Sequence, residues 1–266
     1  MPHLSIPLIR YWVLIGLALA AGLTLQPLPA HAGVIIEGTR QIYPQQRREI
    51  TIRVNNTDKH LPRLVKAWLS ERDDNKEPEH SNVPFTLSPP IFRLDAGKSQ
   101  AMRLTYTQEP LPQDRESVFW LNVLEVPPNT TATQGIDQEE DSNQLRFAFR
   151  IRTKVFFRPQ HLIGTPEQAP AQLIWTLTKN GQDNVLRVHN PSAYHVTFNE
   201  IALASNSRAD AKLHITKEQG MVAPGATLHL VLQENLPVVS PDAQVHYKYI
   251  NDYGAFSTAQ RATLKF

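Results

Sequence analysis

The residues able to carry chemistry are few, because the 266-residue sequence contains ten histidines and no cysteine. Without cysteine there can be no disulfide, thiol nucleophile or thiolate metal site. The histidines show no metal-binding spacing such as H-E-x-x-H, and no G-x-S-x-G turn or glycine-rich phosphate loop occurs. The sequence therefore predicts that the protein is not an enzyme and has no catalytic residue, metal or cofactor.

The segment 145–152 reads Leu-Arg-Phe-Ala-Phe-Arg-Ile-Arg and has a strict period of two. In a β-strand, Leu145, Phe147, Phe149 and Ile151 form one row, and the arginines lie on the other face. One interpretation is a half-buried strand whose apolar row faces its own core. The other is an edge strand that offers this row and its free backbone groups to a partner.

The elements around this segment are expected to be strands as well. Short runs of alternating or β-branched apolar residues recur and are separated by turn-forming residues. These runs are 49–54, 64–69, 101–106, 118–126, 145–157, 173–177, 185–188, 195–203, 227–232 and 244–249. The 21 prolines also favour strands and turns over helices. The pattern predicts sandwiches or barrels, and only 209–219 is compatible with either a short helix or a strand.

Residues 1–32 have the composition of an export signal. Arg10 precedes an apolar run over 11–23, and Ala30-His31-Ala32 fits the small-x-small cleavage pattern. The run is shorter than the roughly 20 residues that a membrane span needs, although an uncleaved anchor is the alternative. We expect cleavage after Ala32 and an exported chain without stable membrane insertion.

The remaining chain is expected to contain two domains. The stretch 160–171 contains Gly164 and two prolines and lacks a sustained apolar pattern. A boundary near Arg158 gives domains at 33–158 and 159–266, each close to the roughly 100 residues of an immunoglobulin-like sandwich. The polar stretch 129–144 is expected to be a surface loop. The net charge of +2 gives no general basic surface for nucleic acid.

Five motifs in residues 33–266 occur in the order and at the spacing of one family, and the chain resembles the periplasmic pilus-assembly chaperones of the chaperone–usher pathway. They are Gly38-Thr39-Arg40, LPQDRES at 111–117, KVFFRP at 154–159, Asn190-Pro191-Ser192 and YINDYG at 249–254. The resemblance implies an all-β protein with two immunoglobulin-like β-sandwich domains in an L or boomerang arrangement. Such chaperones bind and cap pilus or fimbrial subunits by donating an edge strand, and deliver them to an outer-membrane usher.

The resemblance also implies a subunit-binding site. Arg40 and Lys154 match two cations that anchor the subunit's terminal carboxylate, and a fixed end sets the register of the added strand. By family position, Leu145, Phe147 and Phe149 fill the subunit's groove. Ile151 extends this row or turns inward.

A second residue set implied by the resemblance is structural. Glu116, Arg158 and Asp252 match an interdomain ionic cluster that fixes the domain angle. The loop 129–144 is longer than in short-loop relatives, and long-loop relatives carry a disulfide that this chain cannot form, so the fibre class stays open. Self-association of the free protein is a further hypothesis.

The alternative is a secreted carbohydrate-binding β-sandwich protein, such as an adhesin. Fold alone would not separate the two, because sandwiches host many functions. A carbohydrate-binding protein would use exposed aromatic residues and would not need Arg40 and Lys154 together. We therefore expect the chaperone.

Overall fold

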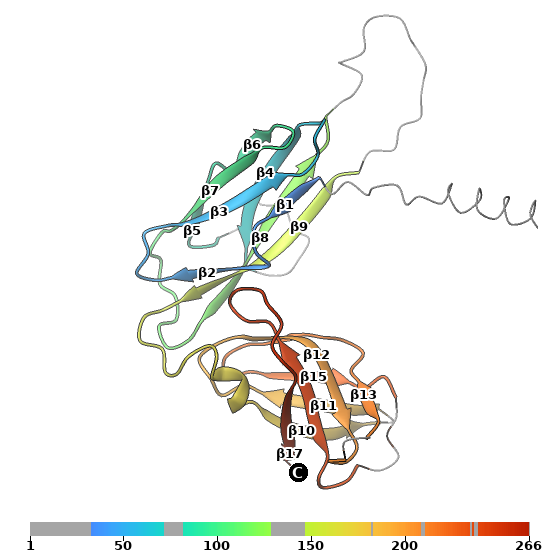
Figure 1. Ribbon diagram of the computed structural model, residues 1–266. Coiled ribbons are helices and arrows are strands. Elements are labelled where there is room, and N and C mark those ends of the chain that lie inside the picture. Colours follow the sequence, from blue (N-terminus) through green and yellow to red (C-terminus); the bar gives the residue numbers. More distant parts are fainter. Residues whose placement is uncertain are drawn as a thin grey trace, which may run out of the picture. The chain divides into compact units, whose positions relative to one another are not determined.

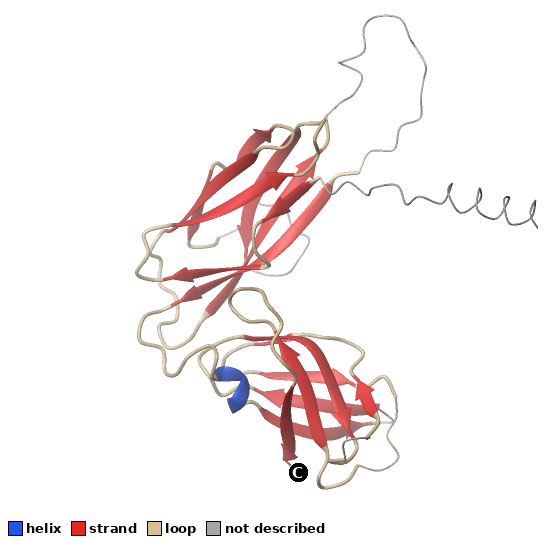
Figure 2. Ribbon diagram, viewed as in Figure 1, coloured by secondary structure: helices blue, strands red, loops and turns tan. Residues whose placement is uncertain are grey.

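The computed structural model describes residues 33–71, 82–128, 147–181, 183–208, 211–234, 236 and 239–265. The predicted loop at 129–144 and Leu145 lie outside these residues. The described chain is built almost entirely of strands, with one short 3-10 helix at Ala169–Gln172 (Figure 2). No helix in this part of the chain is long and apolar enough to cross a membrane.

The first sandwich packs a four-stranded sheet against a five-stranded sheet (Figure 1). The four-stranded sheet has the order β1 (Val34–Ile36), β3 (Ile50–Asn56), β7 (Ser99–Tyr106) and β5 (Phe85–Ser88). The five-stranded sheet has the order β2 (Arg40–Pro44), β9 (Phe149–Arg158), β8 (Ser117–Val126), β4 (Arg63–Ser70) and β6 (Ile91–Leu94). Every pair is antiparallel except β2 with β9, which run parallel.

The N-terminal strand segment changes sheets, and this change positions the site. β1 pairs with β3 in one sheet, whereas β2 pairs with β9 in the other. The chain crosses at Gly38, whose φ of 82° is a conformation that glycine adopts without steric cost. The crossing brings Arg40 into register with Lys154.

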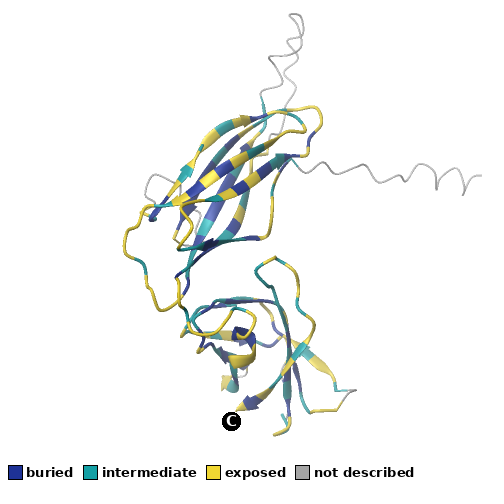
Figure 3. Ribbon diagram, turned by 60° about the vertical axis from the view of Figure 1, so that its left-hand side comes forward, coloured by how far each residue is buried: buried dark blue, intermediate teal, exposed yellow. Residues whose placement is uncertain are grey.

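Alternation along the strands fills the core of this sandwich. Buried and exposed residues form bands along its strands in Figure 3. Tyr43 and Phe157 are fully buried, and their rings stack at 6.1 Å. Phe85 packs edge-on against Phe119 at 5.0 Å. Aromatic side chains of this kind bury large apolar areas, so they stabilise the sandwich that carries β9.

The second sandwich has its own core. Its strands are β10 (Ile174–Asn180), β11 (Asp183–His189), β12 (Val196–Ala204), β13 (Leu213–Ile215), β14 (Met221–Val222), β15 (Thr227–Val231), β16 (Gln244–Tyr249) and β17 (Gln260–Lys265). They follow the order β13-β12-β16-β17-β10-β11-β15, and β14 pairs with β12. A bridge between Thr216 and Leu232 joins the two ends of this order. Trp175 lies in the core and contacts Phe198 and Tyr247.

Each predicted strand run overlaps an observed strand, and β9 begins at Phe149, later than the predicted run 145–157. The region 209–219 contains the short strand β13 rather than a helix. The sequence prediction missed β1, β2, β5, β6, β14 and β17. Most of these are five residues or fewer, too short to display a clear period of two.

Each sandwich fixes a turn with a buried asparagine: Asn56 ends β3, and Asn190 directly follows β11. Nδ2 of Asn56 donates to the carbonyls of Leu61 and Leu94 at 2.9 and 3.1 Å. Nδ2 of Asn190 donates to the carbonyl of Tyr194 at 2.7 Å, and its Oδ1 accepts from the Ser192 hydroxyl at 2.7 Å. The asparagine side chains thus satisfy buried backbone groups that the sheets leave unpaired.

We expect Asn190→Ala to lower the free energy of unfolding by about 2–4 kcal/mol, because it leaves several buried polar groups without a partner. Urea denaturation measures this change. Asn180→Ala, at an exposed position in the same sandwich, is the control and should change stability by less than about 0.5 kcal/mol. Equal effects of the two substitutions would contradict the structural role given to Asn190.

Candidate functional site

One edge of β9 is only half covered. On one side, β8 pairs with β9 from Phe149 to Phe157. On the other side, β2 pairs with β9 only from Lys154 to Arg158. Among the described residues, no strand pairs with this second edge over 149–153. An unpaired edge presents backbone groups to which another strand can be added.

The apolar row of β9 runs from its own core out to the surface. Val155 and Phe157 are fully buried, and Thr153 is also buried. Phe149 is 58% exposed and Phe147 is 60% exposed, with their ring centres 6.2 Å apart. Within segment 145–152, the two exposed phenylalanines do not fit a row that faces its own core, and the interpretation as an edge strand for a partner stays a prediction.

Ile151 lies half-buried between the two halves of the row. It pairs with Val123 of β8 in the sheet register. This is the position at which the row turns from exposed to buried, as the sequence expectation allowed. Leu145 lies outside the described residues, so its place in the row stays a prediction.

Cations and aromatic rings alternate on the opposite face of the five-stranded sheet. The Lys154 ammonium lies 4.9 Å from the ring centre of Trp120, its register partner in β8. The Arg150 guanidinium lies 4.9 Å from the ring centre of Trp68. Cation–π contacts of this geometry restrain long charged side chains. Lys154 is therefore held in place beside Arg40.

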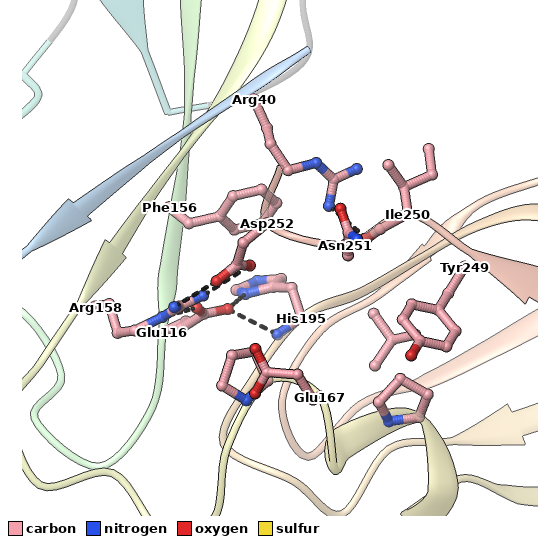
Figure 4. Close-up of a pocket in the computed structure, with 13 residues that line it drawn as sticks. Arg40, Glu116, Phe156, Arg158, Glu167, His195, Tyr249, Ile250, Asn251 and Asp252 are labelled. Carbon is pink, nitrogen blue, oxygen red and sulfur yellow. Dashed lines mark hydrogen bonds and ion pairs between the residues drawn. The ribbon is translucent and has the colours of Figure 1, made fainter. Parts of the chain in front are cut away.

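Arg40 is buried, with 9% of its surface exposed, and its guanidinium reaches the second sandwich. One terminal nitrogen donates to the carbonyl of Ile250 at 2.9 Å (Figure 4). Its Nε is buried and has no hydrogen-bond partner among the described residues. Burial lowers the pKa of Arg40, and the charges of Asp252 and Glu116 partly offset this effect.

Glu116, Arg158 and Asp252, to which the resemblance assigns an ionic cluster, are joined by ion pairs (Figure 4). Arg158 Nε donates to Glu116 Oε1 at 2.7 Å, and its terminal nitrogens donate to Asp252 at 2.7 and 3.1 Å. Burial by itself lowers the pKa of Arg158. The hydrogen bonds to Asp252 and the two carboxylate charges outweigh burial and raise it. The cation is therefore held firmly charged.

His195 is a member of this cluster that the sequence analysis missed. Its backbone N–H donates to Glu116 Oε2 at 2.9 Å, and its Nδ1 lies 3.3 Å from the same oxygen. Its ring also packs against Phe156 at 5.4 Å. Glu116 is thereby held by residues from both sandwiches. No sequence motif surrounds His195, so only the fold could bring it to Glu116.

The YINDYG motif folds as a tight loop against the first sandwich. Oδ1 of Asn251 accepts from the backbone N–H groups of Tyr253 and Ala255 at 3.1 and 2.9 Å. Gly254 has a φ of 80°, and a Cβ at this position would lie 2.4 Å from Oγ1 of Thr39. The positive φ of the turn favours glycine, and the absence of a Cβ leaves room for the Thr39 side chain. The loop presents the ring of Tyr253 to solvent, 91% exposed.

Four of the nine predicted site residues line one cavity. Arg40, Glu116, Arg158 and Asp252 line one cavity of about 110 Å³, together with His195 and others. Lys154 is next to Arg40 in the β2–β9 register. Phe149 is the first residue of β9, and Phe147 lies two residues before it. No group of residues suited to a metal ion occurs among those the structure describes.

Two family descriptions match the chain, and together they span nearly all of residues 33–261. "Pili and flagellar-assembly chaperone, PapD N-terminal domain" matches residues 33–163. "Pili assembly chaperone PapD, C-terminal domain" matches residues 168–261. The first match ends at residue 163 and the second begins at residue 168.

Curated relatives carry the same description. The chain is 39% identical over 229 residues to the probable fimbrial chaperone YadV of Escherichia coli K12, covering 84% of this chain and 87% of the relative. It is 36% identical over 250 residues to the chaperone protein FimB/FhaD of Bordetella pertussis, covering 92% and 94%.

Solved structures agree with these relatives. The crystal structure of the YadV chaperone has a TM-score of 0.71 at 35% identity and covers 88% of this chain and 100% of that one. The Salmonella enterica SafB chaperone, solved in complex with the SafA pilin, is similar with a TM-score of 0.67 at 25% identity, over 90% and 99% of the two chains. With both domains matched and with relatives more than a third identical along most of its length, the chain belongs to the PapD family of pilus and flagellar-assembly chaperones.

Proposed function

We propose that this protein is a periplasmic chaperone that binds pilus or fimbrial subunits by adding β9 as a strand and then delivers them to an outer-membrane usher. One observation carries the proposal: β9 leaves its edge open at 149–153, beside an exposed apolar row. Family membership supports it, as does the SafB–SafA complex, in which a similar chaperone is bound to a pilin.

The apolar row supplies the energy of subunit binding. Fully burying Phe147 and Phe149 contributes about 1.5–3 kcal/mol for each side chain. Each backbone hydrogen bond to the open edge adds about 1 kcal/mol. Association itself costs at least about 4 kcal/mol. The net affinity allows both firm capture and later release.

Arg40 and Lys154 anchor the carboxylate at the end of the subunit chain. They are register partners on adjacent strands, and Arg40 lines a cavity. A carboxylate held at this fixed point sets the register of the subunit strand along β9. The register matters because a slip by one residue would turn every apolar side chain to the wrong face.

The ionic cluster fixes the first sandwich against the second. Arg158 ends β9, Glu116 precedes β8, and Asp252 belongs to the loop after β16. We place the domain boundary at Arg158, giving domains at 33–158 and 159–266, with residues 1–32 removed on export. The carbohydrate-binding alternative is not favoured, since the relatives are chaperones.

We expect Arg40→Ala to weaken subunit binding by roughly 10–150-fold, because a charge-assisted hydrogen bond contributes about 1.5–3 kcal/mol. Lys154→Ala should act in the same direction. The measurement is the dissociation constant for a purified subunit, with Arg53→Ala as the exposed control cation.

A subunit with an amidated C-terminus separates the anchor from other effects. It should bind the wild type as weakly as it binds Arg40→Ala. If amidation and Arg40→Ala weaken binding additively, the carboxylate does not contact Arg40. The thermal midpoint of each variant checks that the Arg40–Ile250 contact is not the cause.

Phe149→Glu should abolish accumulation of soluble subunit on co-expression, because a charge would enter the subunit's apolar groove. Phe147→Glu should act likewise. Ile215→Glu is the matched control: Ile215 is exposed to a similar extent on β13 of the second sandwich. Soluble subunit at wild-type levels with both phenylalanine variants would refute strand addition through this row.

Glu116→Ala should lower the free energy of unfolding by about 3–5 kcal/mol, because it breaks a buried pair and leaves Arg158 with one carboxylate. Asp252→Ala should cost less, since the Asp252 side chain is more exposed than that of Glu116. Residual dipolar couplings in Asp252→Ala should also report a changed orientation of the two domains. Unchanged couplings would mean that the cluster does not fix the domain angle.

A further inference from the structure

Glu125 is a buried carboxylate that the subunit-binding site does not use. It lies near the end of β8, on the face that points toward the other sheet, and is 4% exposed. Its Oε2 accepts a hydrogen bond from the backbone N–H of Val34 at 2.5 Å. No cation of the described residues pairs with it. A buried charge with one neutral donor is costly unless a further partner is present.

The residue beside this carboxylate is Gly33. A Cβ at Gly33 would lie 2.4 Å from Oε2 and 2.6 Å from Oε1 of Glu125. Cβ and the backbone nitrogen of a residue are both bonded to the same Cα, which places the Gly33 nitrogen within about 5 Å of the carboxylate. The carbonyl of Gly33 is fixed in turn by Thr57, whose N–H and hydroxyl donate at 2.8 and 3.0 Å.

Gly33 is also the residue that cleavage after Ala32 would expose. Hydrolysis of the Ala32–Gly33 peptide bond consumes one water and leaves a carboxylate on Ala32 and an amine on Gly33. The amine is protonated at neutral pH, since an α-amino group has a pKa near 7.7–8.0. The uncharged amide next to Glu125 thereby becomes a cation.

We propose that Glu125 binds the α-ammonium group of Gly33 once residues 1–32 are removed, so that export processing completes a buried ion pair in the first sandwich. Glycine lets the carboxylate lie against position 33, whereas a larger residue there would require the Glu125 side chain to move. The inference depends on cleavage after Ala32 and is independent of subunit binding.

The pair would stabilise the end of the sandwich from which the exposed row emerges. Glu125 is the register partner of Phe149, the first residue of β9. Val34, whose N–H also binds Glu125, belongs to the core of the same sandwich. Processing at position 33 therefore supports the strand that we propose to bind subunits.

The test compares two forms of the mature chain made in the cytoplasm, where the initiating Met is removed before a small residue. One form begins at Gly33 and the other carries one additional alanine before Gly33. The extension moves the ammonium away from Glu125, so we expect the thermal midpoint to fall by about 2–8 °C. In a Glu125→Gln background the same extension should change the midpoint by less than about 1 °C. An equal fall in both backgrounds overturns the proposal.

A second measurement follows the amine itself. The Gly33 ¹³Cα shift, recorded against pH, should give a higher titration midpoint in the wild type than in Glu125→Gln, because the carboxylate favours the charged amine. Equal midpoints overturn the proposal. If Glu125→Gln does not fold, a peptide of residues 33–39 replaces it as the reference.

Mass spectrometry of the exported protein identifies the cleavage site in a separate measurement. A mature chain that begins at Gly33 is expected, and any other first residue overturns the inference. Subunit binding plays no part in these measurements, so a failure here and a failure of the proposed chaperone function are distinguishable.

Discussion

The pairing of β2 with only the C-terminal half of β9 is the constraint on which the other features depend. The pairing begins at Arg40 and Lys154 and ends with Pro44 and Arg158. It closes the sandwich where Phe157 is buried and leaves the edge open where Phe149 is exposed. A longer β2 would cover the edge, and a shorter one would expose the core. The same pairing places the two cations side by side at the point where coverage stops.

In β9, the residues that stabilise the sandwich and the residues that are exposed lie in different halves of the strand. An exposed apolar edge favours aggregation unless a partner covers it. The buried half of β9, with Val155 and Phe157, anchors the strand in a core of aromatic residues. The exposed half can therefore remain extended in the free protein without its own packing. In the proposed function, the subunit provides the missing cover.

The ionic cluster shows how the two sandwiches depend on each other. Glu116 receives donors from Arg158 and from the His195 backbone. Arg40 donates to the Ile250 carbonyl, and Gly254 lies against Thr39. Because these groups are buried or half-buried, their interactions are screened less than those of exposed charges.

Local sequence determined the strand character of β9, the two-sandwich fold and the separate pieces of the site. Period-two patterning is a local property, and the motifs carry a family resemblance that composition alone would not reveal. Only the tertiary structure decided where the apolar row passes from core to surface, since that depends on the reach of β2 from a distant part of the chain. The tertiary structure likewise decided that His195 lies at Glu116 and that Glu125 lies at Gly33. Neither contact leaves a local pattern in the sequence. His195 and Glu116 are 79 positions apart, and Glu125 lies on the opposite sheet from Val34, the neighbour of Gly33.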